Sequence, residues 1–510
     1  MVEAVNRAAY RARSNLAGEF VSQGRLARCV HTVDPHTKRS RSGPGYQIHK
    51  MREKLRSVHQ PVIACGPTPV KDTSLDHDDL KQVIIAAVAT FPRDLQYVKF
   101  SAYGFLKNLR FFEPFMVLFL LDKGISYIEI GTLYAIREIA INATEVPSGA
   151  MADILGRRRT MIASFIAYLA SFILFWTGSS LAVFIPAMIL FAFGDAFRTG
   201  THKAMILTYL RLNGIDSYKG EYYGHTRGWS QMGSAVSAAV AAAIVFGYRN
   251  YNAVFLYSTI PYALDLLLLI SYPKELDGEA HQRSGSVRES VRALGRFLKM
   301  TATNRMARRA VVSSSLYSGV YKGTKDFLQP MIVALALTVP MFPSLPVDQR
   351  EAILVGLVYS LLFLITSWSS RKSSSVARWF ASEAAALNWI LIVGIVFAIA
   401  VGVTAALGVS VVPVVLFFMI FVVQNVRRPI GVSVISDSVP EGALATVLSV
   451  ESQTQSIFAA LFAFAVGAIA QAFSNNVGVG IVAVAAVVLL AVPTVWIPQA
   501  SSVEPDGNPG

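Results

Sequence analysis

Long apolar runs, separated by short polar segments, fill the chain from about residue 101 to residue 497. Each run is roughly 18–30 residues long, enough for a helix to cross a hydrocarbon core about 30 Å thick. The pattern predicts two groups of six spans, at 101–122, 128–150, 160–178, 180–210, 226–247 and 252–272, and then at 310–338, 351–370, 385–407, 410–432, 450–473 and 477–497.

Each run is predicted to be an α-helix, because backbone groups inside lipid must find their hydrogen-bond partners within the same segment. A β-barrel would show short strands of alternating polarity, and the runs have no such alternation. The sequence therefore predicts an all-α integral membrane protein with 12 transmembrane helices in two six-helix halves, 101–272 and 310–497.

Polar segments flank and divide the two halves. Residues 1–82 are rich in Arg, Ser, Gly, His and Pro, and we expect a disordered basic extension there. Two starts of translation are open, the written one and a later one at Met51 or Val83, and we expect no cleavable signal peptide. The remaining polar segments are an amphipathic interfacial segment at 83–100, a cytoplasmic central loop at 273–309 with a short amphipathic helix at 287–300, and a cytoplasmic tail at 498–510.

The composition agrees with a membrane protein, since 53% of the residues are hydrophobic and 15% are charged, against about 25% charged in soluble domains. A formal net charge of +14 is also typical of nucleic-acid binding. Here the basic residues lie in loops between apolar spans, as membrane orientation requires, so we expect no nucleic-acid partner. Cys29 and Cys65 both precede the first span, which leaves no thiolate metal site or disulfide in the membrane region.

The loops that carry Lys and Arg fall on one side of the predicted bundle. Examples are loop 2–3 with Arg157 to Arg159, loop 4–5 with Arg211 and Lys219, and the central loop. Loops on the other side, such as 178–180 and 407–410, are short and uncharged. Since basic loops stay in the cytoplasm, both termini are predicted to be cytoplasmic.

The sharpest local motif lies between spans 2 and 3 and reads Gly149-Ala-Met-Ala-Asp153-Ile-Leu-Gly156-Arg157-Arg158-Arg159. It resembles the signature loop of the major facilitator superfamily, G-x-x-x-D-x-x-G-R-R/K, in the position that the family requires. The alternative is an ordinary basic loop with a turn glycine. The resemblance implies a conformational latch that favours the outward-facing state, formed by Gly149, Asp153, Gly156, Arg157 and Arg158.

The chain also departs from the family pattern. Ile154 follows the aspartate where a basic residue is common, and the equivalent loop of the second half, around Arg371 and Lys372, lacks the Gly and Asp. The latch is therefore expected to be asymmetric. Span 5 lacks the Gly-Pro-rich motif of drug/proton antiporters, which disfavours drug export.

Several stretches are similar to the facilitator-type proteins of magnetotactic bacteria, which are associated with iron supply to magnetosomes. They are Glu145-Val-Pro-Ser-Gly149, Gly194-Asp195 with Arg198-Thr-Gly200, and Arg427-Arg428-Pro429-Ile430. This resemblance implies iron as the substrate. It also implies a bacterial inner membrane, or a membrane derived from it such as the magnetosome membrane, as the location.

Ionisable residues inside the spans are functional candidates, because each costs about 2.5–3.5 kcal/mol on insertion. In the first half, Arg110 and Glu113 are three apart and predicted to share a helix face, Glu138 belongs to a polar stripe in span 2, and Asp195 and Arg198 share a face of span 4. We predict a substrate and proton pathway with these three carboxylates as proton sites. The alternative for each residue is a salt bridge that only locks helices together.

Span 7 carries the candidates of the second half, Tyr321, Lys325 and Asp326, just before Pro330. Proline removes a backbone hydrogen bond, so a kink is predicted there. Lys325 and Asp326 are predicted to be a substrate or coupling pair, and the alternative is an anchor in the outer leaflet.

These features predict a proton-coupled secondary transporter of a small molecule or ion, which works by alternating access as a lipid-embedded monomer without a cofactor. No phosphate loop G-x-x-x-x-G-K-[ST] and no H-E-x-x-H zinc motif occurs, so we do not expect an enzyme or an ATP-driven pump. The alternative function is a transport-silent scaffold or sensor of the same fold.

Overall fold

The computed structural model describes residues 93–277, 304–338, 342–439 and 441–498. The predicted extension at 1–82, the start of the interfacial segment, the amphipathic helix at 287–300 and the tail therefore lie outside the described residues. Within them the regular structure is helical, and no strand occurs. The all-α prediction is confirmed for this part of the chain.

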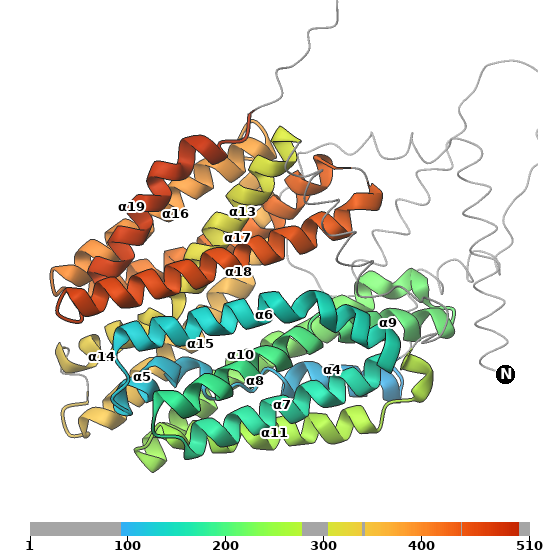
Figure 1. The fold of residues 1–510 in the computed structure, drawn as a ribbon, viewed down its shortest axis with the longest axis horizontal. Helices are drawn as coiled ribbons and strands as arrows, with labels where there is room; N and C mark the ends of the chain where they lie inside the picture. The colour runs from blue at the N-terminus through green and yellow to red at the C-terminus, as the bar shows by residue number, and fades with distance from the viewer. Residues whose placement is uncertain (1–92, 278–303, 339–341, 440, 499–510) are drawn as a thin grey trace, which may run out of the picture. The chain divides into compact units, whose positions relative to one another are not determined.

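The first half places its helices in the predicted order (Figure 1). Its elements are α4 (Leu95–Leu106), η1 (Glu113–Phe115), α5 (Met116–Asp122), α6 (Tyr127–Leu155), α7 (Arg157–Thr177), α8 (Leu181–Arg198), α9 (Thr201–Leu212), η2 (Asp216–Tyr218), α10 (Lys219–Tyr248), α11 (Asn252–Ile270) and η3 (Lys274–Asp277). The second half contains α13 (Arg305–Thr324), η4 (Lys325–Phe327), α14 (Leu328–Thr338), α15 (Val347–Ala377), α16 (Glu383–Ala406), α17 (Val411–Asp437), α18 (Glu441–Ala472) and α19 (Val477–Val495).

Nine helices in the described ranges are long and apolar enough to cross a membrane. The other three predicted spans are 1, 2 and 7. Spans 1 and 7 are interrupted, and α6, which forms span 2, carries charged residues along its middle. Several helices extend beyond the predicted apolar runs, as α15 does at both ends, because a helix continues past the lipid into polar sequence. α4 begins at Leu95, capped by the Asp94 side chain, so residues 95–100, expected at the interface, form the first turns of the first helix.

Three predicted spans are interrupted where the chain carries polar residues. The first is non-helical between α4 and η1, and the fourth breaks at Gly200, whose φ of 82° favours glycine. The seventh changes to a 3-10 turn at Lys325–Phe327, directly before Pro330. This agrees with the predicted kink, since the proline ring clashes with the carbonyl of the fourth residue before it.

Aromatic side chains fill the core of the first half. Phe112 stacks on Phe255 with ring centroids 5.7 Å apart, and Phe165 and Tyr168 both pack on Tyr262. Ser164 donates a hydrogen bond of 2.7 Å to the Gly194 carbonyl, which ties α7 closely to α8. This rigid packing fixes the helices that carry the polar residues of spans 1 and 4.

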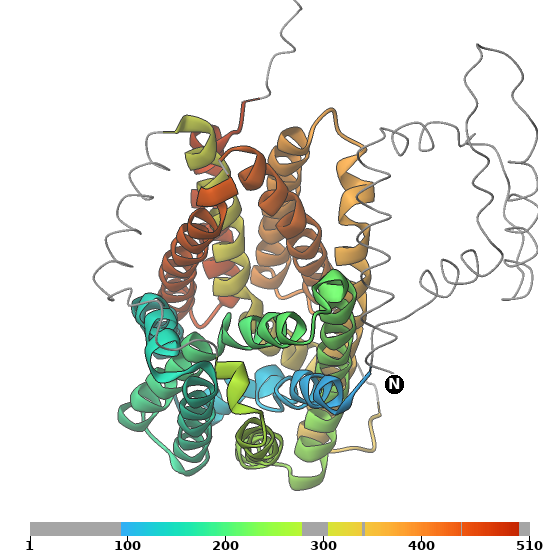
Figure 2. The ribbon, with the colours of Figure 1, turned by 90° about the vertical axis from the view of Figure 1, so that its right-hand side faces the viewer.

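The two halves meet mainly along α6 with α18 and along α10 with α15 (Figures 1 and 2). Here the basic end denotes the end of the bundle that bears Arg157 to Arg159, and the opposite end bears the α5–α6 and α10–α11 connections. At the opposite end Arg249 pairs with Asp348 at 2.5 Å, and Tyr251 donates to Glu351 at 2.7 Å. The hydrogen bond to Asp348 raises the pKa of the Arg249 guanidinium above its ordinary value.

Candidate functional site

A cavity of about 550 Å³ lies between the two halves. Its wall is formed by η1, α6 and α8 from the first half and by α13, η4, α17 and α18 from the second. All eight residues predicted for the substrate and proton pathway line it: Arg110, Glu113, Glu138, Asp195, Arg198, Tyr321, Lys325 and Asp326. The structure therefore brings these residues together around one space, and their role in transport stays a prediction.

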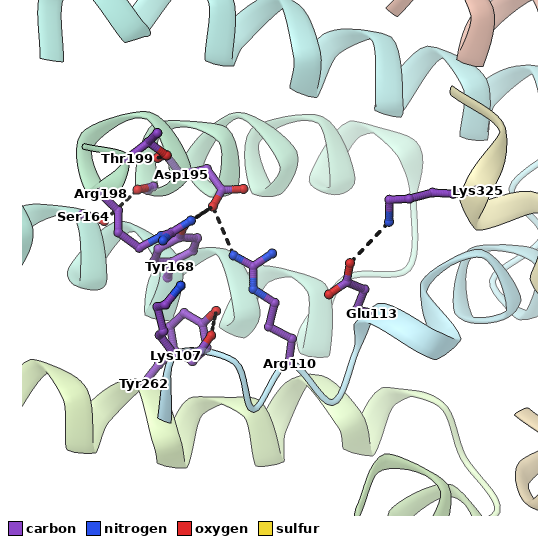
Figure 3. Close-up of polar contacts among 11 residues, drawn as sticks. Lys107, Arg110, Glu113, Ser164, Tyr168, Asp195, Arg198, Thr199, Tyr262 and Lys325 are labelled. Carbon is purple, nitrogen blue, oxygen red and sulfur yellow. Dashed lines mark hydrogen bonds and ion pairs between the residues drawn. The ribbon is translucent and has the colours of Figure 1, made fainter. Parts of the chain in front are cut away.

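Asp195 on α8 is the centre of the first polar cluster (Figure 3). One of its oxygens, Oδ1, accepts from Arg110 at 3.2 Å, from Arg198 at 3.0 Å and from the Tyr168 hydroxyl at 2.5 Å. The Asp195 and Arg198 side chains are each 18% exposed. Two guanidinium groups thus share one carboxylate, which leaves an excess of positive charge in this cluster.

Arg110 and Glu113 do not share a helix face, which corrects the sequence prediction. The chain is not helical between Leu106 and Glu113, so a spacing of three does not align the two side chains. Arg110 turns toward Asp195, whereas Glu113 turns toward Lys325 (Figure 3).

Lys325 connects the two halves at the 3-10 turn of span 7. Its ammonium group lies 2.7 Å from Asp326 and 3.3 Å from Glu113 of the first half. Gln329 adds a second link, since its amide donates to the Glu113 carbonyl at 2.9 Å and accepts from the Val117 N–H at 2.7 Å. Lys325 and Asp326 therefore face the interior of the bundle and the partner half.

Glu138 forms the third cluster at the middle of α6. Its carboxylate lies 3.0 Å from Arg137 and 3.9 Å from Lys322 of α13, and its side chain is 5% exposed. Arg137 also lies over the Tyr134 ring, 4.6 Å from the centroid. Helix α6 is unbroken here, and the polar stripe predicted for span 2 faces the cavity, where Glu138 and Glu145 both line the wall.

The cavity wall is close to electrically balanced. Six of its side chains are cationic, Arg110, Arg137, Arg198, Lys322, Lys325 and Arg428, and five are anionic, Glu113, Glu138, Glu145, Asp195 and Asp326. Gln424 and Arg428 of α17 line the same space, and Glu145 accepts from Ser452 at 3.3 Å. Within the described ranges no three His, Cys, Asp or Glu side chains group as they would to hold a metal ion.

Two residues near this site escaped the sequence analysis. Asp265 of α11 is completely buried, and neither of its carboxylate oxygens has a hydrogen-bond partner in the described part of the chain. The signal was present, because Asp265 is the one charged residue in the apolar run of α11. Lys107 follows the last residue of α4, and its charge acts on Asp265.

The predicted latch loop is ordered around Gly156, whose φ is 94°. Arg157 donates to the Thr208 hydroxyl at 2.6 Å, and the Arg158 side chain donates to the Ile270 carbonyl at 3.0 Å. The carboxylate that accepts from the first turn of α7 is that of Asp277, at 2.6 Å from the Arg158 N–H. The surroundings of the Gly149 and Asp153 side chains lie outside the described residues, and the latch role stays a prediction.

Comparison with known proteins gives a family match, a curated relative and similar solved structures. A family model described as the Major Facilitator Superfamily matches residues 102–450. The uncharacterized MFS-type transporter YxaM of Bacillus subtilis (strain 168) is 22% identical over 241 residues, which cover 47% of this chain and 59% of that protein. The match thus spans little more than half the length of that curated relative.

Solved structures share the fold. The nucleoside transporter NupG superposes with a TM-score of 0.65 at 13% identity, covering 80% of this chain and 100% of that chain. A bacterial homologue of the human lysosomal transporter Spinster, in an inward-facing and occupied conformation, superposes with a TM-score of 0.59 at 14% identity, covering 80% and 97%. At this identity the likeness establishes the arrangement of helices and leaves the solute open.

Proposed function

Because the chain belongs to the major facilitator superfamily, we propose that it is a secondary active transporter that moves a small polar solute by alternating access. The observation that carries the proposal is the central cavity, to which both halves contribute cationic and anionic side chains. A charged group inside a membrane protein is costly, and it usually marks a solute or ion pathway.

The distribution of contacts between the halves supports a state open at the basic end. The ion pair of Arg249 with Asp348 and the hydrogen bond of Tyr127 with Gln471 join the halves at the opposite end. Toward the basic end, the hydrogen bonds between the halves in the described ranges are those of Asn142 with the Gln453 carbonyl and of Ser452 with Glu145, which both join α6 and α18. If the basic end is cytoplasmic, as the loop charges predict, this state is inward-open.

Proton coupling is part of the proposal. Glu113, Glu138 and Asp195 each contact at least one cationic group, so protonation of a carboxylate would release its partner for the solute. Iron as the solute, and a magnetosome membrane as the location, rest on the sequence resemblance alone. The ion pairs of the wall support a polar or charged solute of either sign.

Thiol labelling from both sides of the membrane tests alternating access without a known solute. Cys29 and Cys65 are changed to serine, and a cysteine is then placed at Ser456, which is buried at the cavity wall. A membrane-impermeant thiol reagent is applied to sealed vesicles of each orientation. A carrier exposes Ser456→Cys to both sides in turn, so labelling is expected from either side.

Ser374→Cys, exposed on α15 near the basic end, is the matched control and is expected to react from one side only. A transport-silent scaffold fixed in one state would give single-sided labelling at Ser456→Cys too. That result, in protein that remains folded, would overturn the proposed function.

A further inference from the structure

A second cavity of about 440 Å³ opens between α4, α9 and α10, and it is called here the basic compartment. Five of its lining residues are Lys or Arg, and none of its described lining residues is Asp or Glu. The cations are Lys107, Arg198, Lys203, Arg227 and Arg428. Arg198 and Arg428 also line the central cavity, so the two spaces adjoin.

Lys107 and Arg198 point toward the same region (Figure 3). Nε of Arg198 donates to the Tyr168 hydroxyl at 3.1 Å, and Nη2 donates to Asp195 at 3.0 Å. The Lys107 ammonium has no hydrogen-bond or ion-pair partner in the described ranges, although the Lys107 carbonyl is held by the Tyr262 hydroxyl at 3.1 Å. Its backbone is therefore fixed, and its charge has no direct ion pair, although the carboxylates of Asp195 and Asp265 act on it from a longer distance.

Two neutral features add hydrogen-bond donors to this region. Tyr103 lines the compartment with 1% of its surface exposed, and its hydroxyl has no hydrogen-bond partner within the described residues. The 12-residue helix α9 starts at the compartment, with Gly200 as its N-cap and no side-chain cap. Free N–H groups at a helix N-terminus favour an anion.

Cations that share a partly enclosed space repel one another, and walls of low dielectric focus their field into the space between them. An acid of the protein would relieve this repulsion, but the described wall contains none. Of the two acids close to it, Asp195 is already shared by two arginines, and Asp265 forms no hydrogen bond with any of the five cations. A bound anion would supply the negative charge that this wall lacks.

We propose that the basic compartment binds a phosphate or carboxylate group of the transported solute, and that the solute is a compact anion of charge −2 or more. The inference rests on the proposed carrier function and names its solute class. Lys107 and Arg198 hold the oxyanion, and Arg198 passes it to the central cavity, whose wall it shares. Lys203, Arg227 and Arg428 attract the anion at the entrance.

Binding of defined anions to the full-length protein in neutral detergent tests this class. The probes are inorganic phosphate and citrate, with glucose as a neutral control and spermidine as a cationic one. Phosphate or citrate is expected to bind and to stabilise the protein against heat, whereas glucose and spermidine do neither. Lys107→Gln should weaken anion binding about tenfold or more, the usual effect of losing a charged hydrogen bond. Lys107→Arg should stay within about threefold.

Lys372→Gln is the matched control, because Lys372 is exposed on α15 and lines neither cavity. Its anion affinity should equal that of the parent protein. Arg227→Gln is a second test variant at an exposed position of α10 that does not depend on the buried core. A several-fold weaker affinity is expected for it.

Three results would overturn the inference. Either no anion binds, or Lys107→Gln binds the anions as tightly as the parent protein, or anionic lipid vesicles bind while phosphate and citrate do not. The labelling of Ser456→Cys separates these from a failure of the carrier. Two-sided labelling without anion binding removes the solute class and leaves the carrier. One-sided labelling removes the carrier. Counterflow of radiolabelled phosphate or citrate in proteoliposomes that is lost in Lys107→Gln would support both the carrier function and the anionic solute class.

Discussion

Gly131→Ala is expected to shift the protein away from the state described above. Gly131 on α6 faces α18 at the opposite end, where a Cβ would lie 2.6 Å from the Ala463 carbonyl oxygen and 3.1 Å from the Phe464 Cα. Real Cβ contacts essentially never fall below 3.0 Å. The contact of 2.6 Å must lengthen to at least 3.0 Å, so the two helices must separate by about 0.4 Å or more. Close-packed backbones leave no other room for an added carbon.

Overpacking of a tight contact costs about 1–3 kcal/mol. Since α6 and α18 belong to different halves, most of this cost falls on the state in which the opposite end is closed. A difference of 1.4 kcal/mol is a factor of ten in an equilibrium, so the ratio of the two states should change by about 5- to 150-fold.

Distances between spin labels measure this shift in the cysteine-free chain. Ser179 and Val409, exposed in the short loops of the opposite end, form one pair, and Ser217 and Ser374 form the other at the basic end. In Gly131→Ala the first distance should lengthen and the second should shorten. Unchanged distributions at both ends would refute the assignment of this contact to the closed end.

Gly402→Ala is the matched control, because its Cβ would lie 2.7 Å from the Gly478 carbonyl within the second half. It is expected to lower thermal stability without changing either distance. If Gly402→Ala shifted the distances as strongly, general loosening would explain both variants.

Three further outcomes follow from the polar clusters. Asp195→Asn leaves two arginines without their shared carboxylate and should lower the free energy of unfolding by about 1–3 kcal/mol. This loss is smaller than that for breaking a fully buried ion pair, because water in the cavity reaches the site. An unchanged melting temperature in detergent would contradict this. Asp265→Asn breaks no hydrogen bond, so the melting temperature should stay within the error of that of the parent protein. If Asp265 carries the coupled proton, this substitution should abolish pH-driven uptake while counterflow persists. Intact pH-driven uptake would exclude that role. Lys325→Gln removes both carboxylate contacts of the 3-10 turn and should broaden the distance between labels at Ser179 and Val409, whereas an unaltered width would show that this pair does not hold the halves.

The sequence predicted which residues face the interior but not which residues pair. Ionisable groups in apolar spans avoid lipid, so the pattern alone indicated that Glu138, Asp195 and Lys325 share an interior. Pairing depends on backbone breaks and on the register of one half against the other. The non-helical turn after α4 sends Arg110 to Asp195 and Glu113 to Lys325, and no periodicity in the chain encodes that turn.

Asp265 and Lys107 illustrate a second limit. Asp265 interrupts an apolar run, so it could have been noticed, but its lack of partners arises only when α4, α7 and α11 pack together. Lys107 looks like an ordinary basic residue near a helix end. Its position in a wall that contains five cations and no described acid emerges only from the three-dimensional packing.

The breaks in spans 1, 4 and 7 explain why the charges gather where they do. An unbroken helix satisfies its own backbone and can move only as a rod, whereas a broken one exposes N–H and carbonyl groups and can bend at one position. Arg110, Arg198 and Lys325 each lie at or beside such a break, and their ion pairs link one broken span to another. When a carboxylate changes its cationic partner at one break, the ion pair that links this break to another span is lost, and the bend of that span can change. A bound anion, which competes with Asp195 for Arg198, would act on the same helix breaks.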